Sequence, residues 1–170
     1  MLFGYREIIP VFCFDPRFNQ QQVQKYDIRK AGIWRSRFLI ETVEDFRRNL
    51  KGLGSGLLVS QDTPEEFLKS LVNPALQTTL VFQAETSDEE VKIEALVREK
   101  MREADPACNI VSIWGSTLHH MDDLPYDPVE YFPHTYGNMR KKQVEVKVRP
   151  MVETPDIGSL PFLDESNTSE

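Results

Sequence analysis

"GLLVSQDTPEEFLKSLV", residues 56–72, decides the fold, because a short apolar run passes directly into the start of a helix. Residues 56–61 are predicted to form a buried strand, since strands of a covered parallel sheet are apolar along their whole length. Thr63 is placed to act as the helix N-cap, and Pro64 suits the first helical position. Glu66 completes a capping box with Thr63. The stretch therefore predicts a strand–helix unit.

The same alternation extends to both sides of this unit. A helix is predicted from 33 to 53, where apolar residues recur at helical spacing and the glycines of "GLGSG" follow. Trp34 and Phe38, near its start, are assigned to the core. A second amphipathic helix is predicted over 87–105, with Ser87 as N-cap, an acidic start and a basic end.

Further apolar runs complete the pattern. They predict strands at 8–14, 78–85 and 108–115. Strands that alternate with helices of this length are typical of an α/β fold with a Rossmann-like, doubly wound parallel sheet and helices on both faces.

Composition narrows the class of protein. The chain has 170 residues and a net charge of −7, from 27 acidic and 20 basic residues, which argues against strong nucleic-acid binding. Its two cysteines lie far apart, which favours a reducing compartment over a disulfide framework. No apolar run approaches the roughly 20 residues of a membrane span, and no secretory signal is visible. We expect a soluble, intracellular protein, without distinguishing the cytoplasm from an organelle.

The region after Trp114 lacks a sustained period. His119, His120, Asp122 and Asp123 are ligand types for zinc, and His134 is near enough in sequence to join them. Their spacing is not that of a metal motif, so a surface loop is the preferred interpretation. Residues 140–150, "RKKQVEVKVRP", are interpreted as a solvated linker, with an edge strand as the alternative because valines alternate there. Residues 161–170 are predicted to be a disordered tail.

Several segments together resemble one family. They are "PVFCFDPRF" (10–18), "GIWRSRFLIETVEDFRRNLKGLGSGLLVSQDTPEEFLKSL" (32–71), "VFQAETSDEEVKIEALV" (81–97) and "WGSTLHHMDDLPYD" (114–127). In order and spacing they resemble the N-terminal α/β domain of the cryptochrome and DNA photolyase family, closest to its DASH branch. The resemblance implies an α/β domain over 8–127, incomplete at its N-terminus, and a linker-like segment and tail over 128–170.

Two parts of the family pattern find no match in this sequence. One is a first strand and helix with an "RNDLRLHDN"-like segment, and the other is the helical domain that binds FAD. The family includes deoxyribodipyrimidine photolyases, whose photochemistry belongs to the flavin. The resemblance therefore implies that FAD belongs to full-length members and that this chain is inactive alone.

The remaining function implied by the resemblance is to hold a light-harvesting antenna chromophore, often methenyltetrahydrofolate. Glu85, after the strand at 78–85, is the candidate contact, because a carboxylate can accept two parallel hydrogen bonds from a pterin edge. Cys13, Phe14 and Asp15 would line the same crevice by resemblance. Read from the residues alone, Glu85 suits a helix start, Cys13 a buried apolar position and Asp15 a turn.

We therefore expect an antenna-binding α/β domain of the kind found in blue-light photoreceptors and DNA repair photolyases. The alternative is a shortened, non-catalytic interaction protein that pairs with itself or with a full-length homologue through an open sheet edge. No metal site and no membrane partner are expected.

Overall fold

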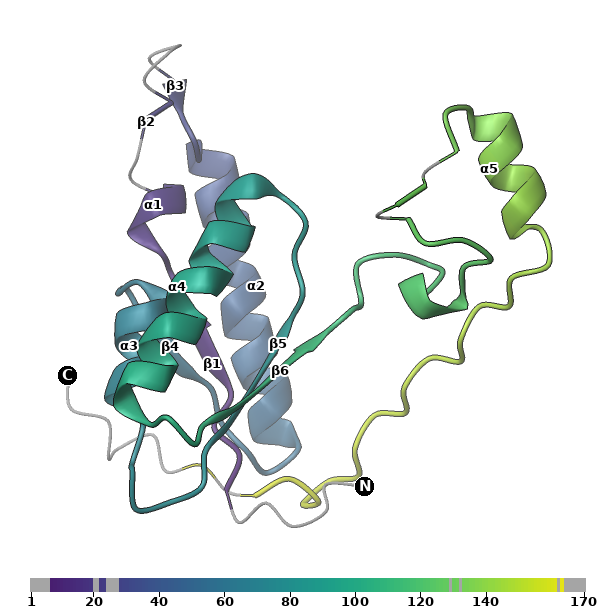
Figure 1. Ribbon diagram of the computed structural model, residues 1–170. Helices are drawn as coiled ribbons and strands as arrows, with labels where there is room; N and C mark the ends of the chain where they lie inside the picture. Colours follow the sequence, from purple (N-terminus) through teal and green to yellow (C-terminus); the bar gives the residue numbers. More distant parts are fainter. Residues whose placement is uncertain are drawn as a thin grey trace. The chain divides into compact units, whose positions relative to one another are not determined.

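The computed structural model describes residues 7–19, 22, 23, 28–128, 130, 131, 133–161 and 163. Strands and helices alternate along the chain, and the strands of the main ladders are parallel (Figure 1). The predicted α/β class is confirmed. The elements, in chain order, are β1 (Val11–Cys13), α1 (Pro16–Asn19), β2 (Gln22–Val23), β3 (Ile28–Arg29), α2 (Ile33–Gly52), β4 (Leu58–Ser60), α3 (Pro64–Ser70), β5 (Thr79–Gln83), α4 (Asp88–Ala104), β6 (Asn109–Ile113), the 3-10 turn η1 (Met121–Asp123) and α5 (Tyr136–Gln143).

The chain divides into two compact units. The first comprises Met1–Leu71 with Glu153–Glu170, and the second Val72–Val152. The domain boundary predicted between 127 and 128 stays a prediction. Of the predicted disordered tail, residues 162 and 164–170 lie outside the described residues, whereas Leu163 is described and is buried. No helix in the described part of the chain combines the length and apolar character that crossing a bilayer requires.

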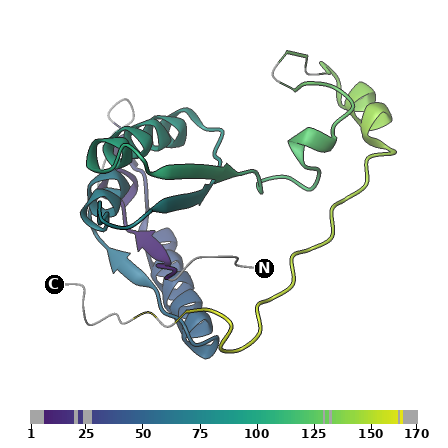
Figure 2. The same ribbon diagram turned by 60° about the horizontal axis from the view of Figure 1, so that its bottom comes forward.

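In the first unit, β1 and β4 form a parallel ladder with Phe12 opposite Val59. The helix α2 lies along this ladder (Figure 2). Leu57, which precedes β4, is fully buried, and Val43 supplies the buried centre of α2. A second, antiparallel ladder joins β2 to β3. The apolar run at 56–61 thus supplies the buried residues Leu57 and Leu58, whereas the residues of β1 are only partly buried.

The end of α2 follows the predicted pattern. Gly54 has a φ of 88°, in the left-handed region that favours glycine, directly after the helix. The Leu53 N–H still donates to Asn49 O and Leu50 O, both at 3.1 Å. From the other end of the chain, Gly158 N–H donates to Leu53 O at 3.0 Å. This last bond ties the C-terminal part of the first unit to the end of α2.

The assignment of Trp34 and Phe38 to the core is wrong. Their exposed fractions are 79% and 69%, whereas that of Val43 is 6%. An α-helix turns about 100° per residue, so Trp34 lies on the side of α2 opposite to Val43. Both aromatic rings fit the helical period, but they belong to its outer face.

The predicted N-cap residues lie at the helix starts as expected, but their side chains do not make the predicted hydrogen bonds. Thr63 and Ser87 are the N-cap residues of α3 and α4, yet neither side chain makes a capping hydrogen bond. The Glu66 N–H, which the Thr63 hydroxyl would cap, already donates to Thr63 O at 3.2 Å. The predicted capping box is therefore absent.

In the second unit, β5 and β6 form a parallel ladder of five residue pairs, from Thr79–Asn109 to Gln83–Ile113. The helix α4 follows β5 and lies along one face of this ladder (Figures 1 and 2). The Arg98 guanidinium of α4 stacks over the Phe82 ring, 5.0 Å from its centroid. Val97 and Met101 on the same helix are buried. The ladder and α4 place the carboxyl ends of β5 and β6 side by side.

The chain beyond β6 is less regular, but it contains one helix that the sequence pattern did not predict. This helix, α5, has Thr135 as its N-cap, and the Thr135 side chain accepts a bond from Asn138 N–H. The edge strand considered for 140–150 is wrong, because the first four of these residues belong to α5 and the rest form no strand. A turn bond from Val146 N–H to Gln143 O, at 3.0 Å, follows the helix instead.

Candidate functional site

The first candidate segment lies at the carboxyl end of β1. Phe14 N–H donates to Ser60 O at 2.8 Å, which extends the β1–β4 ladder by one residue. The Phe14 ring meets Phe12 edge to face, with centroids 5.1 Å apart. Asp15 follows and is only 4% exposed, although carboxylates are seldom buried without partners. Its burial therefore requires a cation close by.

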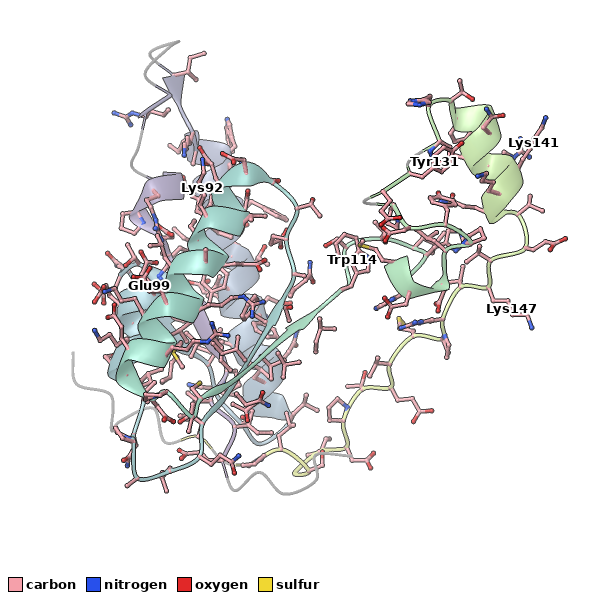
Figure 3. All side chains as sticks on the ribbon, in the orientation of Figure 1. Lys92, Glu99, Trp114, Tyr131, Lys141 and Lys147 are labelled. Carbon is pink, nitrogen blue, oxygen red and sulfur yellow. The ribbon has the colours of Figure 1, made fainter. Side chains whose placement is uncertain are left out.

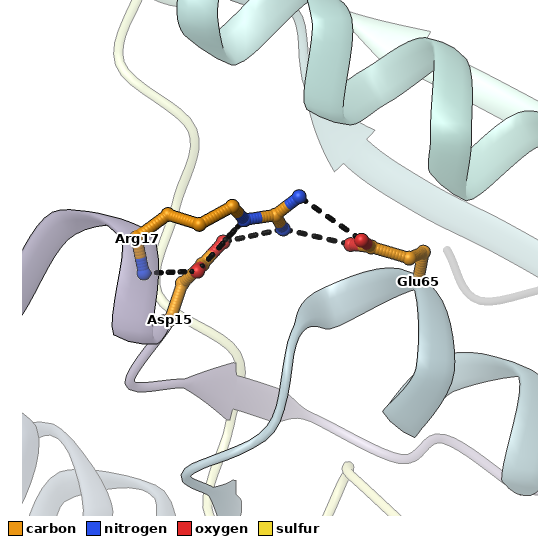
Figure 4. A network of polar contacts seen from close by, with 3 residues as sticks. All are labelled: Asp15, Arg17 and Glu65. Carbon is orange, nitrogen blue, oxygen red and sulfur yellow. Dashed lines mark hydrogen bonds and ion pairs between the residues drawn. The ribbon is translucent and has the colours of Figure 1, made fainter. Parts of the chain in front are cut away.

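Arg17 is that cation, and it binds two carboxylates at once (Figure 4). Its Nε donates to both oxygens of Asp15 at 2.9 Å, and Nη2 donates to Asp15 Oδ2 at 2.6 Å. Nη1 and Nη2 donate to Glu65 Oε1 and Oε2 at 3.0 and 2.8 Å. The network joins the loop after β1 to the first turn of α3.

This network leaves the Asp15 carboxylate fully engaged. Its Oδ1 also accepts the backbone N–H of Arg17 at 2.8 Å, in the manner of an Asx turn. Hydrogen bonding to Asp15, and then to Glu65, raises the pKa of the Arg17 guanidinium. Arg17 is thus held as a cation between two buried anions, and Asp15 has the surroundings of a turn former, which is one of the two roles expected for it.

Cys13 is a half-buried free thiol in the same segment. Burial raises the pKa of the Cys13 thiol to about 11, and the nearby carboxylates of Asp15, Asp62 and Glu65 add to the effect. At neutral pH the group is therefore a neutral thiol rather than a nucleophilic thiolate. It can line a ligand site as a small, weakly polar surface.

Glu85 lies two residues beyond β5, as Asp15 does beyond β1, but its surroundings differ from those of Asp15. Its side chain is exposed, and within the described residues no hydrogen bond or ion pair engages its carboxylate. Its backbone N–H, by contrast, donates to Glu94 Oε1 at 2.7 Å. The position thus combines a fixed backbone with a carboxylate that can accept hydrogen bonds from a ligand.

The loop after β6 lies beside Glu85 and carries further polar groups. Gln83 Nε2 donates to Ser116 Oγ at 3.2 Å, and Ser116 Oγ donates to Ala84 O at 3.4 Å. Trp114 marks the end of β6 (Figure 3), and its indole N–H donates to Thr117 Oγ1 at 2.8 Å.

The histidine-rich loop has partners of its own. The Asp122 N–H donates to His120 Nδ1 at 3.2 Å, and Arg149 binds Asp123 through two bonds of 2.6 and 2.7 Å. The Arg149 guanidinium lowers the pKa of Asp123. Across the described residues, no group of three or more His, Cys, Asp or Glu side chains is arranged to hold a metal ion.

The four predicted ligand contacts divide between the two units. Cys13, Phe14 and Asp15 belong to the first unit and Glu85 to the second. Cys13 is the last residue of β1, and Phe14, Asp15 and Glu85 lie just beyond the carboxyl end of a parallel strand, where α/β proteins place their ligands. Their assignment as ligand contacts stays a prediction.

Sequence reasoning missed Arg17, Glu65 and Glu94. The signal for Arg17 was its place in the "FDPR" turn, two residues after an aspartate that directly follows an apolar run. A carboxylate at the end of a buried strand calls for a cation nearby. Glu65 and Glu94 had none, because Glu65 resembles the other carboxylates of an acidic helix start and Glu94 is one of several charged residues within α4.

Comparison with known proteins is consistent with this architecture. A family model described as DNA photolyase matches residues 4–156. Cryptochrome DASH of Danio rerio is 38% identical over 153 residues, which cover 88% of this chain and 28% of the relative. Blue-light photoreceptor PHR2 of Arabidopsis thaliana is 36% identical over 155 residues, which cover 91% of this chain and 34% of that protein.

A solved structure gives the same result in three dimensions. The crystal structure of a Synechocystis sp. PCC6803 cryptochrome matches with a TM-score of 0.76 and 28% identity, over 85% of this chain and 29% of that one. The chain thus spans about a third or less of the length of the proteins it matches. One further relative, from Arabidopsis thaliana, carries the name "Cryptochrome DASH, chloroplastic/mitochondrial" and is 34% identical.

Proposed function

This chain belongs to the DNA photolyase family, with DASH cryptochromes among its relatives, and we propose that it serves as an antenna-type domain that binds a light-harvesting chromophore. The ligand we propose is a reduced folate, with methenyltetrahydrofolate as the first choice. FAD and its photochemistry remain expectations for full-length members of the family. The observation that carries the proposal is the exposed carboxylate of Glu85 after β5, which has no hydrogen-bond or ion-pair partner within the described part of the chain.

The chemistry of Glu85 fits such a ligand. A pterin ring presents a ring N–H beside an exocyclic amino group, and a carboxylate can accept one hydrogen bond from each in parallel. Because the Glu85 side chain is exposed and has no partner among the described residues, it needs no internal bond broken before it binds. Cys13, Phe14 and Asp15, in the first unit, stay predicted ligand contacts and are not needed for the argument from Glu85.

A thermal melt tests the proposal directly. The purified chain is heated with and without methenyltetrahydrofolate at about 100 times its dissociation constant, which should stabilise the folded state by about 2.7 kcal/mol. For a chain of this size each kcal/mol raises Tm by roughly 2–4 °C, so the melt should move by several degrees. An unchanged Tm at saturating ligand contradicts the proposal.

Two variants make the test specific for Glu85. Glu85→Gln keeps the shape but replaces one charged acceptor with an amide N–H₂, so binding should weaken by about tenfold or more. Glu99→Gln is the matched control, because Glu99 is an exposed glutamate on α4 (Figure 3). Equal affinity in the two variants argues against Glu85 as the contact.

A second candidate function rests on the strand edges. Pro10 O and Phe14 N–H bond toward β4, so Val11 and Cys13 direct their backbone groups to the other edge of β1. By the same alternation, Thr79, Val81 and Gln83 direct theirs away from β6. In the described residues no strand pairs with either edge, which favours a chain that pairs with itself or with a homologue.

Light scattering across a range of protein concentrations tests this second candidate. Association through strand edges predicts a molecular mass that rises with concentration. A constant monomer mass at all concentrations contradicts it and leaves the antenna proposal unaffected.

A further inference from the structure

One peptide group at the end of β5 is held at both of its polar atoms. It links Ala84 to Glu85, and its N–H belongs to Glu85 while its carbonyl belongs to Ala84. Glu94 Oε1 accepts the N–H at 2.7 Å, and Ser116 Oγ donates to the carbonyl oxygen at 3.4 Å. The two partners come from different elements, since Glu94 lies on α4 and Ser116 follows β6.

Each partner is itself held in place. The Glu94 side chain is only 20% exposed and lies 4.0 Å from the Arg98 guanidinium. That guanidinium is in turn held against the ladder, because it stacks on the Phe82 ring. Ser116 accepts a bond from Gln83 Nε2 at 3.2 Å. On the strand side, Ala84 N–H donates to Ile113 O at 2.8 Å. The backbone that carries the Glu85 side chain is thus anchored to β6, to α4 and to the loop after β6.

The short bond to Glu94 is the stronger of the two. A carboxylate that accepts a backbone N–H forms a charge-assisted hydrogen bond, which is shorter and stronger than one between neutral groups. The distances of 2.7 and 3.4 Å agree with this order. We therefore expect Glu94 to have the larger effect on the orientation of Glu85 and Ser116 a smaller one.

From this arrangement we infer that Glu94 and Ser116 are positioning residues, which hold the Glu85 carboxylate ready for a ligand that presents two adjacent N–H donors. The inference rests on the proposed function and goes beyond it, because it assigns a role to two residues that need not touch the ligand. A carboxylate on an anchored backbone loses less conformational entropy on binding than one on a free loop.

Titration of methenyltetrahydrofolate into variants of the whole chain measures the effect. Glu94→Ala should weaken binding by roughly 3- to 10-fold, since it removes one hydrogen bond that orients Glu85. Glu94→Gln should restore most of the affinity, because its amide oxygen can accept the same N–H. Ser116→Ala should weaken binding by less, and Glu99→Ala, an exposed control on α4, should have no effect.

The same variants in a Glu85→Ala background separate positioning from a general structural role. If Glu94 acts through Glu85, then Glu94→Ala causes no further loss once the Glu85 carboxylate is gone. An equal loss in both backgrounds overturns the inference, and so does unchanged affinity of Glu94→Ala in the wild-type background.

Hydrogen exchange tests the anchoring without any ligand. The Glu85 amide should be protected in the wild type and in Glu94→Gln, and should exchange faster in Glu94→Ala. An unprotected Glu85 amide in the wild type overturns the inference alone. A different outcome is possible, in which the protection depends on Glu94 but the wild type binds no folate. That outcome overturns the proposed function and with it the positioning role. The anchoring of the peptide by Glu94 would still be established.

Discussion

Arg17 and Glu65 lie 48 positions apart in the sequence, and the guanidinium of one donates two near-parallel hydrogen bonds to the carboxylate of the other, at 3.0 and 2.8 Å. The same guanidinium binds Asp15, which is almost fully buried. One cation therefore ties the loop after β1 to the start of α3 (Figure 4). The loop follows β1 and the helix follows β4, which are the two strands of the same ladder.

Loss of this cation should be costly. In Arg17→Met the carboxylates of Asp15 and Glu65 stay buried without their shared partner, which we expect to lower the free energy of unfolding by about 3–5 kcal/mol. Arg37→Met removes an exposed ion pair with Glu41 and should cost at most about 1 kcal/mol. Urea unfolding of both variants gives the comparison, and equal costs contradict a special role for Arg17.

The contrast between a buried residue before β4 and an exposed residue on α2 leads to a second prediction. Leu57 is fully buried, so Leu57→Ala should lower the free energy of unfolding by about 2–5 kcal/mol. Trp34 is 79% exposed, so Trp34→Ala should change it by only about 0.5 kcal/mol, despite the larger side chain removed. A large loss in Trp34→Ala would instead indicate that another surface covers this face of the helix.

Gly54 and Gly52 form a matched pair at the end of α2. Gly54→Ala places a Cβ at a φ of 88° and should cost about 1–2 kcal/mol, because an L-residue disfavours the left-handed region. Gly52 is helical with open space around it, so Gly52→Ala should stabilise the chain by about 0.5 kcal/mol. Chemical denaturation should show opposite signs for the two substitutions.

The thiol of Cys13 leads to a prediction about pH. Its pKa is raised from 9.0 to about 11, so between these values the unfolded chain releases a proton that the folded chain retains. The contribution of Cys13 to folding stability is therefore present below pH 9 and is lost as pH rises toward 11. Iodoacetamide should modify Cys13 slowly in the native chain at pH 9 and rapidly in urea, as followed by mass spectrometry. Equal rates in the two conditions would contradict the raised pKa.

The sequence predicted best what depends on local pattern. The prediction of a helix over 33–53 matches α2 to within one residue, because period and terminal glycine are local signals. The strand predicted over 8–14 shortens to Val11–Cys13, since ladder length depends on the partner strand. The helix α5 gave no signal, because its sequence "YGNMRKKQ" has too few apolar residues to show a period.

Contacts between distant residues lay beyond the sequence pattern. The approach of Arg17 to Glu65 and the outward position of Trp34 both depend on how α1, α2 and α3 pack on the β1–β4 ladder. Glu85 could be selected from the family resemblance together with its place after a strand, but its anchoring by Glu94 required the geometry of the helix. The resemblance indicated the position of the expected ligand contact, and the hydrogen bonds of Glu94 and Ser116 show what holds the backbone there.

The bond from Gly158 to Leu53 has a consequence for synthesis on the ribosome. Domains fold largely in the order in which they emerge, but the first unit includes residues from both ends of the chain. The second unit, Val72–Val152, leaves the ribosome whole before Gly158 does. The first unit is therefore completed after the second, and the nascent chain must keep the end of α2 available until Gly158 arrives.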